Sequence, residues 1–406
     1  MQISVHSETA KLKHVLLHRP GEELEQLTPA RLEPMLFDDI PYIHGAQREH
    51  DAFADALKSQ GVEVHYLTEL AAEALSQDEG IKRKFVEEFI HLSGPAAVYN
   101  ANKLLDRLLN IESTKDMVIK TMAGITLDDI DGKEIHPLSS KLRHESSFVT
   151  LPMPNLYFTR DPMACIGKGA VLSSMYAASR KRETLYSKYI LKYHPQFKKP
   201  VPFYYDLSIP YPIEGGDILC PAKDLLIIGI SQRTSPEAIE ILAKHLFTDE
   251  DSGFTRILAL DIPKLRAYMH LDTVMTQVDT DSFTVHPGLL RDFRAFTITM
   301  GAKNTLDVTE ECGTMDTILA KTMGQDKINL IPCGGDDEIA AQREQWNDAS
   351  NTLCIAPGVV IVYDRNAVTN AIIRDAGIRT IEIPGSELGR GRGGPRCMTM
   401  PLERQN

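Results

Sequence analysis

The sequence predicts an α/β fold in which a ββαβ unit is repeated and a helical segment is inserted. Three observations predict it. Four stretches share one strand–turn–strand pattern, and the first three of them start at nearly equal intervals. A separate stretch has helical periodicity. The 406 residues suit two to three domains of about 150 residues each. With 43% hydrophobic and 25% charged residues, the chain is neither disordered nor fibrous.

The repeated stretches each have a polar start, an apolar strand, a short turn and a second apolar strand. They begin at Arg160, Gly216, Leu271 and Ser350. Helical segments follow most of them, as at 235–247 and 366–377, and further strands follow at 255–263 and 379–385. This order of elements is a ββαβ unit.

The spacing of the units predicts how they are arranged. Asp161 and Asp217 are 56 residues apart, and Asp217 and Asp272 are 55 apart. Strands at 14–20 and 62–67 supply one more unit, which makes five. A near-fixed period of this size predicts a five-bladed ββαβ propeller, in which the strand starts meet at the axis and Asp161 and Asp272 face one central site. An ordinary mixed sheet with unrelated hairpins remains the alternative.

The inserted segment is predicted to be helical. Ile81, Phe85, Phe89 and Ile90 share one face of a predicted helix, and a second helix carries leucines at 104, 105, 108 and 109, after a break at 93–95. We therefore expect an inserted helical domain at 71–148 and an α/β catalytic domain at 1–70 and 149–406. Packing, rather than chemistry, is the expected role of the insert.

Charge and cysteine content narrow the functional classes. With 44 basic and 56 acidic residues the net charge is −12, which argues against a broad nucleic-acid or anionic-membrane surface and permits a cationic substrate. We find no signal peptide, and no run of 18 apolar residues that would predict a membrane span. The six cysteines form no C-x-x-C pair, which predicts free thiols in a reduced, cytoplasmic protein.

The segment 389–405 carries the strongest chemical signal. Cys397 follows four glycines that are interleaved with Arg390, Arg392 and Arg396. Glycines allow the backbone to approach a ligand closely, and arginines bind carboxylates and lower the pKa of a thiol. The alternative is a buried structural cysteine beside a solvated basic loop, which is the reading we give to Cys165, Cys220 and Cys354 in their apolar strands.

Three other segments place polar residues at strand starts. His270 and Asp272 are two residues apart, so on a strand their side chains face the same way and combine a proton carrier with a cation-binding carboxylate. Glu214 could orient that histidine, and Asp161 could be a second cation anchor. The plainer alternatives are that His270 and Asp272 form a surface or hydrogen-bonded core pair without a catalytic role, that Glu214 is an acidic residue in a turn, and that Asp161 is an acidic residue at a strand end. A zinc site of His270, Asp272 and Cys397 lacks paired ligand spacing.

A basic stretch at 179–194 is predicted to be a solvated helix face. Arg180, in this stretch, and Arg233 each follow the second strand of a unit at equivalent places. That equivalence favours a position at the rim of the site over plain surface.

The ordered set FTRDP (158–162), IEGGD (213–217), HLDT (270–273) and GGPRCMTMPL (393–402) resembles the arginine deiminase family across essentially the whole chain. The resemblance implies the pentein-like five-bladed ββαβ propeller of the guanidino-group-modifying enzymes. It also implies hydrolysis of L-arginine to L-citrulline and ammonia through a covalent cysteine intermediate, without metal or organic cofactor. The expected partners are L-arginine and further copies of the chain, with no nucleic acid and no membrane.

The resemblance also implies a role for each site residue. Cys397 would be the nucleophile, and Asp161 and Asp272 would hold the guanidinium. His270 would protonate the departing ammonia and then activate water, while Glu214 bonds to it. The substrate's α-carboxylate and α-amine would be held near Asn155, Phe158, Arg180, Arg233 and Arg392.

Two kinds of alternative function stay open. One is a related enzyme, namely an amidinotransferase or a dimethylarginine or agmatine hydrolase. The other is a non-catalytic arginine-binding protein on the same fold. Three candidate arginines for one carboxylate favour an amino-acid substrate over agmatine, and the presence of Cys397 and His270 argues against a binding protein.

Overall fold

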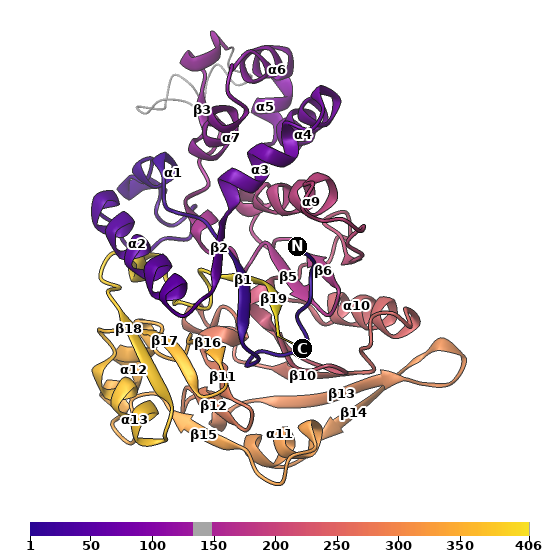
Figure 1. The fold of residues 1–406 in the computed structure, drawn as a ribbon, viewed down its shortest axis with the longest axis vertical. Helices are drawn as coiled ribbons and strands as arrows, with labels where there is room; N and C mark the ends of the chain where they lie inside the picture. The colour runs from indigo at the N-terminus through magenta and orange to yellow at the C-terminus, as the bar shows by residue number, and fades with distance from the viewer. Residues whose placement is uncertain (133–147, 406) are drawn as a thin grey trace.

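Five sheets of the computed structural model share one three-strand pattern (Figure 1). The structure describes residues 1–132 and 148–405. In each pattern an antiparallel pair is followed by a third strand that runs parallel to the second. The strands of the first four patterns are β5 (Met163–Ile166), β6 (Gly169–Leu172), β7 (Phe203–Tyr205); β8 (Ile218–Ala222), β9 (Leu225–Ile230), β10 (Arg256–Asp261); β11 (Met275–Asp279), β12 (Ser282–Val285), β15 (Asn329–Pro332); and β16 (Leu353–Ala356), β17 (Val359–Tyr363), β18 (Arg379–Ile383).

The fifth pattern joins the two ends of the chain. Its strands are β19 (Met400–Arg404), β1 (Leu12–Leu17) and β2 (Glu63–Tyr66). The predicted strands at 14–20 and 62–67 therefore form, and the C-terminal strand completes their sheet, which the sequence analysis did not anticipate. The mixed α/β class is confirmed, and each unit has the ββαβ order.

A helix connects the second and third strands of each unit. These helices are α9 (Glu183–Tyr193), α10 (Pro236–Thr248), α11 (Met315–Met323), α13 (Ala367–Asp375) and α2 (Ile43–Ser59), while α12 (Glu338–Trp346) precedes β16. The sequence explains α10 well. Ser235 caps its first turn by accepting a hydrogen bond from the Ala238 amide, and Pro236 occupies the first helical position.

The predicted solvated helix face at 179–194 is wrong. Eight residues of α9 are buried, and Leu185, Tyr186 and Tyr189 join the largest apolar core. The prediction assumed that basic residues mark a solvated face, but two arginines just before the helix are buried because specific groups pair with them. Arg180 pairs with carboxylates, and Arg182 donates to the Leu151 carbonyl.

Helices between β2 and β4 gather at one end of the molecule (Figure 1). They are α3 (Leu67–Leu75), α4 (Glu79–Leu92), α5 (Pro95–Tyr99), α6 (Ala101–Leu109) and α7 (Thr114–Ala123). The break predicted at 93–95 separates α4 from α5, and Phe85 and Phe89 are buried as expected. A short pair, β3 (Ile125–Thr126) and β4 (Phe148–Thr150), closes the segment, and residues 133–147 of the predicted insert lie outside the described residues.

Smaller elements complete the described chain. Two antiparallel strands, β13 (Arg294–Met300) and β14 (Leu306–Glu311), widen the β8–β9–β10 sheet and extend away from the rest of the molecule (Figure 1). A short helix, α1 (Glu22–Glu25), follows β1. Within the ranges that the structure describes, no helix is both long and apolar enough to cross a membrane.

Candidate active site

The predicted catalytic residues occupy the same place in different units, just before the first strand. Asp161 precedes β5, Glu214 precedes β8, His270 and Asp272 precede β11, and Cys397 precedes β19. Because the units repeat one geometry, this position recurs in space as well as in sequence. All five residues are buried, and Asp161 acts electrostatically on both His270 and Cys397, so the structure brings the five into one region.

His270 hydrogen-bonds one carboxylate and lies at ion-pair distance from another. Its Nε2 lies 2.8 Å from Glu214 Oε2, and its Nδ1 lies 3.7 Å from Asp161 Oδ1. The Sγ atom of Cys397 lies 3.6 Å from Asp272 Oδ2. A nucleophile, a histidine and three carboxylates therefore share one buried region.

Glycines make room for this cluster at two points. A Cβ atom on Gly216 would lie 2.7 Å from His270 Cγ, closer than side chains tolerate. A Cβ atom on Gly393 would lie 2.3 Å from Phe158 Cε1. The GGD turn before β8 and the glycine-rich loop before Cys397 are thus required by close approach, as expected for the loop.

Each of the two carboxylates that are predicted to bind the guanidinium also pairs with a buried arginine. Arg180 Nη1 lies 2.8 Å from Asp161 Oδ2, and Arg396 Nη1 lies 2.8 Å from Asp272 Oδ2. Arg396 also pairs with Glu8, whose pKa is lowered to about 2 because Arg396 and Arg160 outweigh the effect of burial. Buried carboxylates need such partners, since an unpaired buried charge is costly.

The charges around His270 and Glu214 favour an ionised pair. Burial opposes charge on His270, but Asp161 and the hydrogen bond to Glu214 raise its pKa to about 9. Burial also opposes charge on Glu214, but Arg233 and the same hydrogen bond lower its pKa to about 2. At neutral pH His270 is therefore an imidazolium that can donate a proton.

The surroundings of Cys397, in contrast, favour the neutral form of its thiol. Burial, followed by the negative charges of Asp272 and Asp161, raises its pKa well above the usual range. Asn351 contacts the thiol, with its Nδ2 3.1 Å from Sγ. The resting protein therefore holds a neutral thiol in the same buried region as an imidazolium.

Because the pKa of His270 is raised in the folded protein, we expect the unfolding free energy to depend on pH. Its unfolded value is near 6.5 and its folded value about 9, so the stabilisation by the charged form is complete below about pH 6.5 and is lost as pH rises through about 9. We expect the wild type to lose about 3 kcal/mol of unfolding free energy relative to His270→Asn between pH 6.5 and 10. Urea unfolding at several pH values measures this, and a pH-independent difference would contradict it.

All five predicted tail-binding residues are buried, and two of them, Arg180 and Arg233, contact the catalytic cluster. Arg233 Nη1 lies 3.5 Å from Glu214 Oε2, and Arg180 contacts Asp161. The Phe158 ring packs on Tyr157, and Asn155 donates a hydrogen bond to the Met35 carbonyl. Arg392 lies over the ring of Trp346, with a left-handed backbone at φ 65°. All ten predicted site residues expose at most 4% of their surface.

The site also contains a group of ligand atoms with metal-like spacing. Asp161, Glu214 and His270 place one ligand atom each within 4.8 Å of one another. The trio of His270, Asp272 and Cys397 considered in the sequence does not form such a group among the described residues. Arg180 and Arg233 add two positive charges close to Glu214, which would oppose a divalent cation there.

Sequence reasoning missed Asn351. Besides its contact with the thiol, its Oδ1 accepts a hydrogen bond from the Cys397 amide, and its Nδ2 donates to the Asp272 carbonyl. A signal was available: Asn351 precedes β16, the same place that Asp161, Glu214 and Asp272 occupy in their units. Glu183, which binds Arg180 through both carboxylate oxygens, was also missed and carried no such signal.

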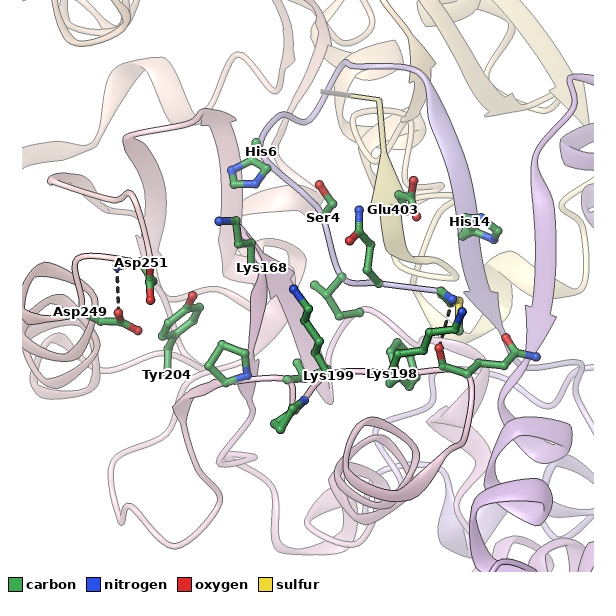
Figure 2. Close-up of a pocket in the computed structure, with 18 of the residues that line it drawn as sticks. Ser4, His6, His14, Lys168, Lys198, Lys199, Tyr204, Asp249, Asp251 and Glu403 are labelled. Carbon is green, nitrogen blue, oxygen red and sulfur yellow. Dashed lines mark hydrogen bonds between the residues drawn. The ribbon is translucent and has the colours of Figure 1, made fainter.

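A pocket of about 970 Å³ lies elsewhere, between the N-terminal segment and residues 196–204 (Figure 2). His6, Lys168, Lys199 and Tyr204 are among its lining residues, and none of the ten predicted site residues lines it. The buried cluster around His270 is therefore not part of this open pocket.

Comparison with known proteins agrees with the geometry. The family described as arginine deiminase matches residues 33–404. A Treponema denticola protein named arginine deiminase is 51% identical over 405 residues, covering 100% of this chain and 99% of that protein. A Clostridium perfringens protein of the same name is 49% identical over 407 residues, covering 100% and 98%.

Solved structures share the fold at low identity. SxtG, an amidinotransferase from Microseira wollei in the saxitoxin biosynthetic pathway, has a TM-score of 0.56 at 15% identity, covering 100% of this chain and 98% of that one. DDAH from Pseudomonas aeruginosa, complexed with citrulline, has a TM-score of 0.51 at 18% identity, covering 96% and 99%. These two structures show only that the fold is shared. The full-length sequence matches and the family match show that the chain belongs to the arginine deiminase family.

Proposed function

We propose that this protein hydrolyses L-arginine to L-citrulline and ammonia in arginine catabolism. The observation that carries the proposal is the meeting of Cys397, His270 and three carboxylates in one buried cluster, within a member of the arginine deiminase family. A cysteine and a protonated histidine supply a nucleophile and an acid, and the carboxylates supply a cation site.

Asp161 and Asp272 would bind the substrate's guanidinium group. Asp161 Oδ1 has no hydrogen-bond partner among the described residues, so one acceptor remains for the substrate. A carboxylate on each side matches the planar fork of a guanidinium and would fix its central carbon toward Sγ. Because all ten predicted site residues are buried, entry of arginine requires side-chain or loop movement.

In the first half of the reaction, the Cys397 thiol would release its proton to solvent as arginine binds, and the resulting thiolate would attack the guanidinium carbon. A carbon–sulfur bond forms, one terminal carbon–nitrogen bond breaks, and the nitrogen leaves as ammonia with a proton from His270. The product is a thiouronium intermediate on Cys397. Splitting the displacement in this way replaces one difficult step with two easier ones.

In the second half, neutral His270 would take a proton from water, and the resulting oxygen nucleophile attacks the same carbon. The carbon–sulfur bond breaks, the thiolate of Cys397 is restored, and citrulline is released after its ureido group loses a proton to solvent. Glu214 would hold His270 in place through both halves, since it contacts the Nε2 atom at 2.8 Å.

The substrate would activate its own nucleophile. In the resting protein, burial and the charges of Asp272 and Asp161 raise the pKa of the Cys397 thiol. A bound guanidinium neutralises those carboxylates and places a positive charge near sulfur, which favours the thiolate. The thiol would therefore ionise chiefly in the arginine complex.

Arg233 and Arg392 are better placed than Arg180 to bind the substrate's α-carboxylate. The donors of Arg180 are occupied by Asp161 and Glu183. Arg233 Nη1, by contrast, makes no hydrogen bond among the described residues and only an ion-pair contact of 3.5 Å with Glu214 Oε2, and Nε and Nη1 of Arg392 make no hydrogen bond either. Asn155 and Phe158 would complete this end of the site.

Replacing Arg233 tests the tail assignment. Arg233→Ala should raise KM for arginine about ten- to a hundred-fold, because a charge-assisted bond is worth about 1.5–3 kcal/mol. The wild type should prefer arginine strongly over agmatine, which lacks the carboxylate, and the variant should discriminate less. Exposed Arg379→Ala is the matched control. An unchanged preference in Arg233→Ala and Arg392→Ala would reject both arginines as carboxylate ligands.

The architecture and cellular setting are proposals as well. Five sheets of one pattern, with β19 completing the sheet of β1 and β2, support a closed five-bladed ββαβ propeller. We retain the division into a catalytic domain (1–70 and 149–406) and a helical insert (71–148). Six unpaired cysteines support a cytoplasmic location. We also expect a homo-oligomer, which light scattering of the purified protein would detect.

The activity assay separates the candidate functions. We expect purified protein to convert arginine to citrulline and an equal amount of ammonia, with dimethylarginine and agmatine turned over poorly. Transfer of the amidino group to an added amine would indicate an amidinotransferase. Arginine binding without citrulline would indicate a binding protein and would reject the proposed function.

A further inference from the structure

We infer that β1 and β2 carry a binding site for a divalent transition-metal ion such as Zn²⁺, formed by His14, Glu63 and His65. This cluster is separate from the predicted catalytic residues, none of which belongs to it. Each of its three residues offers a ligand atom, and these atoms lie within 4.8 Å of one another.

The sheet register explains why the three side chains meet. β1 and β2 are parallel neighbours, and His14 is the register partner of Glu63. His65 is two residues after Glu63, so both point from the same face of β2. The alternation of a strand therefore places two imidazoles and one carboxylate on one patch of the sheet.

The distances suit a single small ion. His14 Nδ1 and His65 Nε2 share a hydrogen bond of 3.0 Å, which an ion bound between them would replace, and they lie 3.6 Å and 3.5 Å respectively from different oxygens of Glu63. Ligand atoms about 2.0–2.2 Å from one zinc ion have separations in this range. The two rings are stacked with centroids 5.3 Å apart, so little rearrangement is needed to direct both nitrogens at one point.

The chemistry of the donors favours zinc or its neighbours in the first transition row. Two imidazoles and one carboxylate form the His₂Glu set found in zinc sites that keep an open position.

Exposure leaves room for the ion and for its remaining ligands. The side chain of His65 is 9% exposed, that of His14 23% and that of Glu63 64%. His14 and Glu63 also line the pocket of about 970 Å³, and Figure 2 shows His14 beside β1 at its border. Water or a small anion from this side could fill the open positions.

Zinc titration of the full chain tests this inference. The protein should carry no affinity tag, because an N-terminal tag would lie beside the site, and it should have Cys397→Ala to remove the buried thiol. We expect calorimetry to detect one Zn²⁺ per chain. His65→Gln and His14→Gln should each weaken binding by at least about tenfold. Loss of a residue that only hydrogen-bonds to a metal ligand already lowers metal affinity by about that factor. Exposed His91→Ala is the matched control and should bind as the parent does.

Two further measurements guard against a folding artefact and a misplaced ion. Zn²⁺ should raise the Tm of the parent and of His91→Ala but not that of His65→Gln, compared with each protein in chelator. Co²⁺ should give visible d–d bands without a thiolate charge-transfer band. Absence of binding in the parent, unchanged affinity in both His variants, or a thiolate band would overturn the inference.

Discussion

Cys397→Ala is expected to abolish citrulline formation, with kcat/KM for arginine reduced by at least about 10⁴-fold, as when other covalent enzymes lose their nucleophile. The reason is that the remaining groups can bind and orient the guanidinium but cannot form the thiouronium bond. Ammonia release, followed continuously, measures the loss.

The fold should survive this change, so the loss can be assigned to chemistry. Cys397 is buried and contacts Asn351 and Asp272, and removal of one sulfur there should cost about 1 kcal/mol of stability. Cys165→Ala, in the buried strand β5, is the matched control and should keep nearly full activity. Near-normal turnover by Cys397→Ala would reject the covalent mechanism.

His270→Asn is the second large effect that we expect. General acid–base catalysis contributes about 10²–10⁴-fold, and His270 acts in both halves of the proposed reaction, so kcat should fall toward the upper end of that range. The histidine is also the base for water, which means that a covalent intermediate should persist once it has formed.

A substrate analogue separates the two roles of His270. S-methyl-L-thiocitrulline loses methanethiolate, which needs no proton from an acid. His270→Asn should therefore form the adduct on Cys397 with this analogue and then hydrolyse it slowly. Thr273→Ser, which keeps the hydroxyl that donates to the His270 carbonyl, is the matched control. Rapid release of citrulline by His270→Asn would contradict the role of His270 as the base.

The repeated unit could be predicted from sequence because it depends on local signals. The apolar strands around β8 and β9 are separated by a short turn and followed by a capped helix, and these features need no knowledge of distant contacts. The catalytic residues shared this advantage. Asp161 and Asp272 stand at equivalent strand starts, so the repeat predicted that they face one site, and Glu214 and His270 were recognised at strand starts of the same kind.

Features that depend on long-range pairing were not predictable in the same way. The sheet that joins β19 to β1 links residues nearly 400 positions apart, and no local pattern encodes that pairing. The burial of Arg180 and Arg182 depends on Glu183, Asp161 and the Leu151 carbonyl, which only the folded chain brings close. Charge alone made that segment look solvated.

Asn351 illustrates a limit of chemical motifs. An amide is neither a nucleophile nor a titrating group, so a search for reactive residues passes over it. Its two hydrogen bonds with Cys397, one to the amide and one to the thiol, become visible only when the starts of β16 and β19 are placed side by side. The repeat, applied to every unit, would have identified it.

Rapid acid quench of the wild type during turnover of arginine should trap the covalent intermediate. We expect mass spectrometry of the digested protein to find the peptide containing Cys397 heavier by the mass of arginine less ammonia, with no such adduct on Cys165 or Cys312. Full turnover under the same conditions without any adduct on Cys397, or with the adduct on another residue, would contradict it.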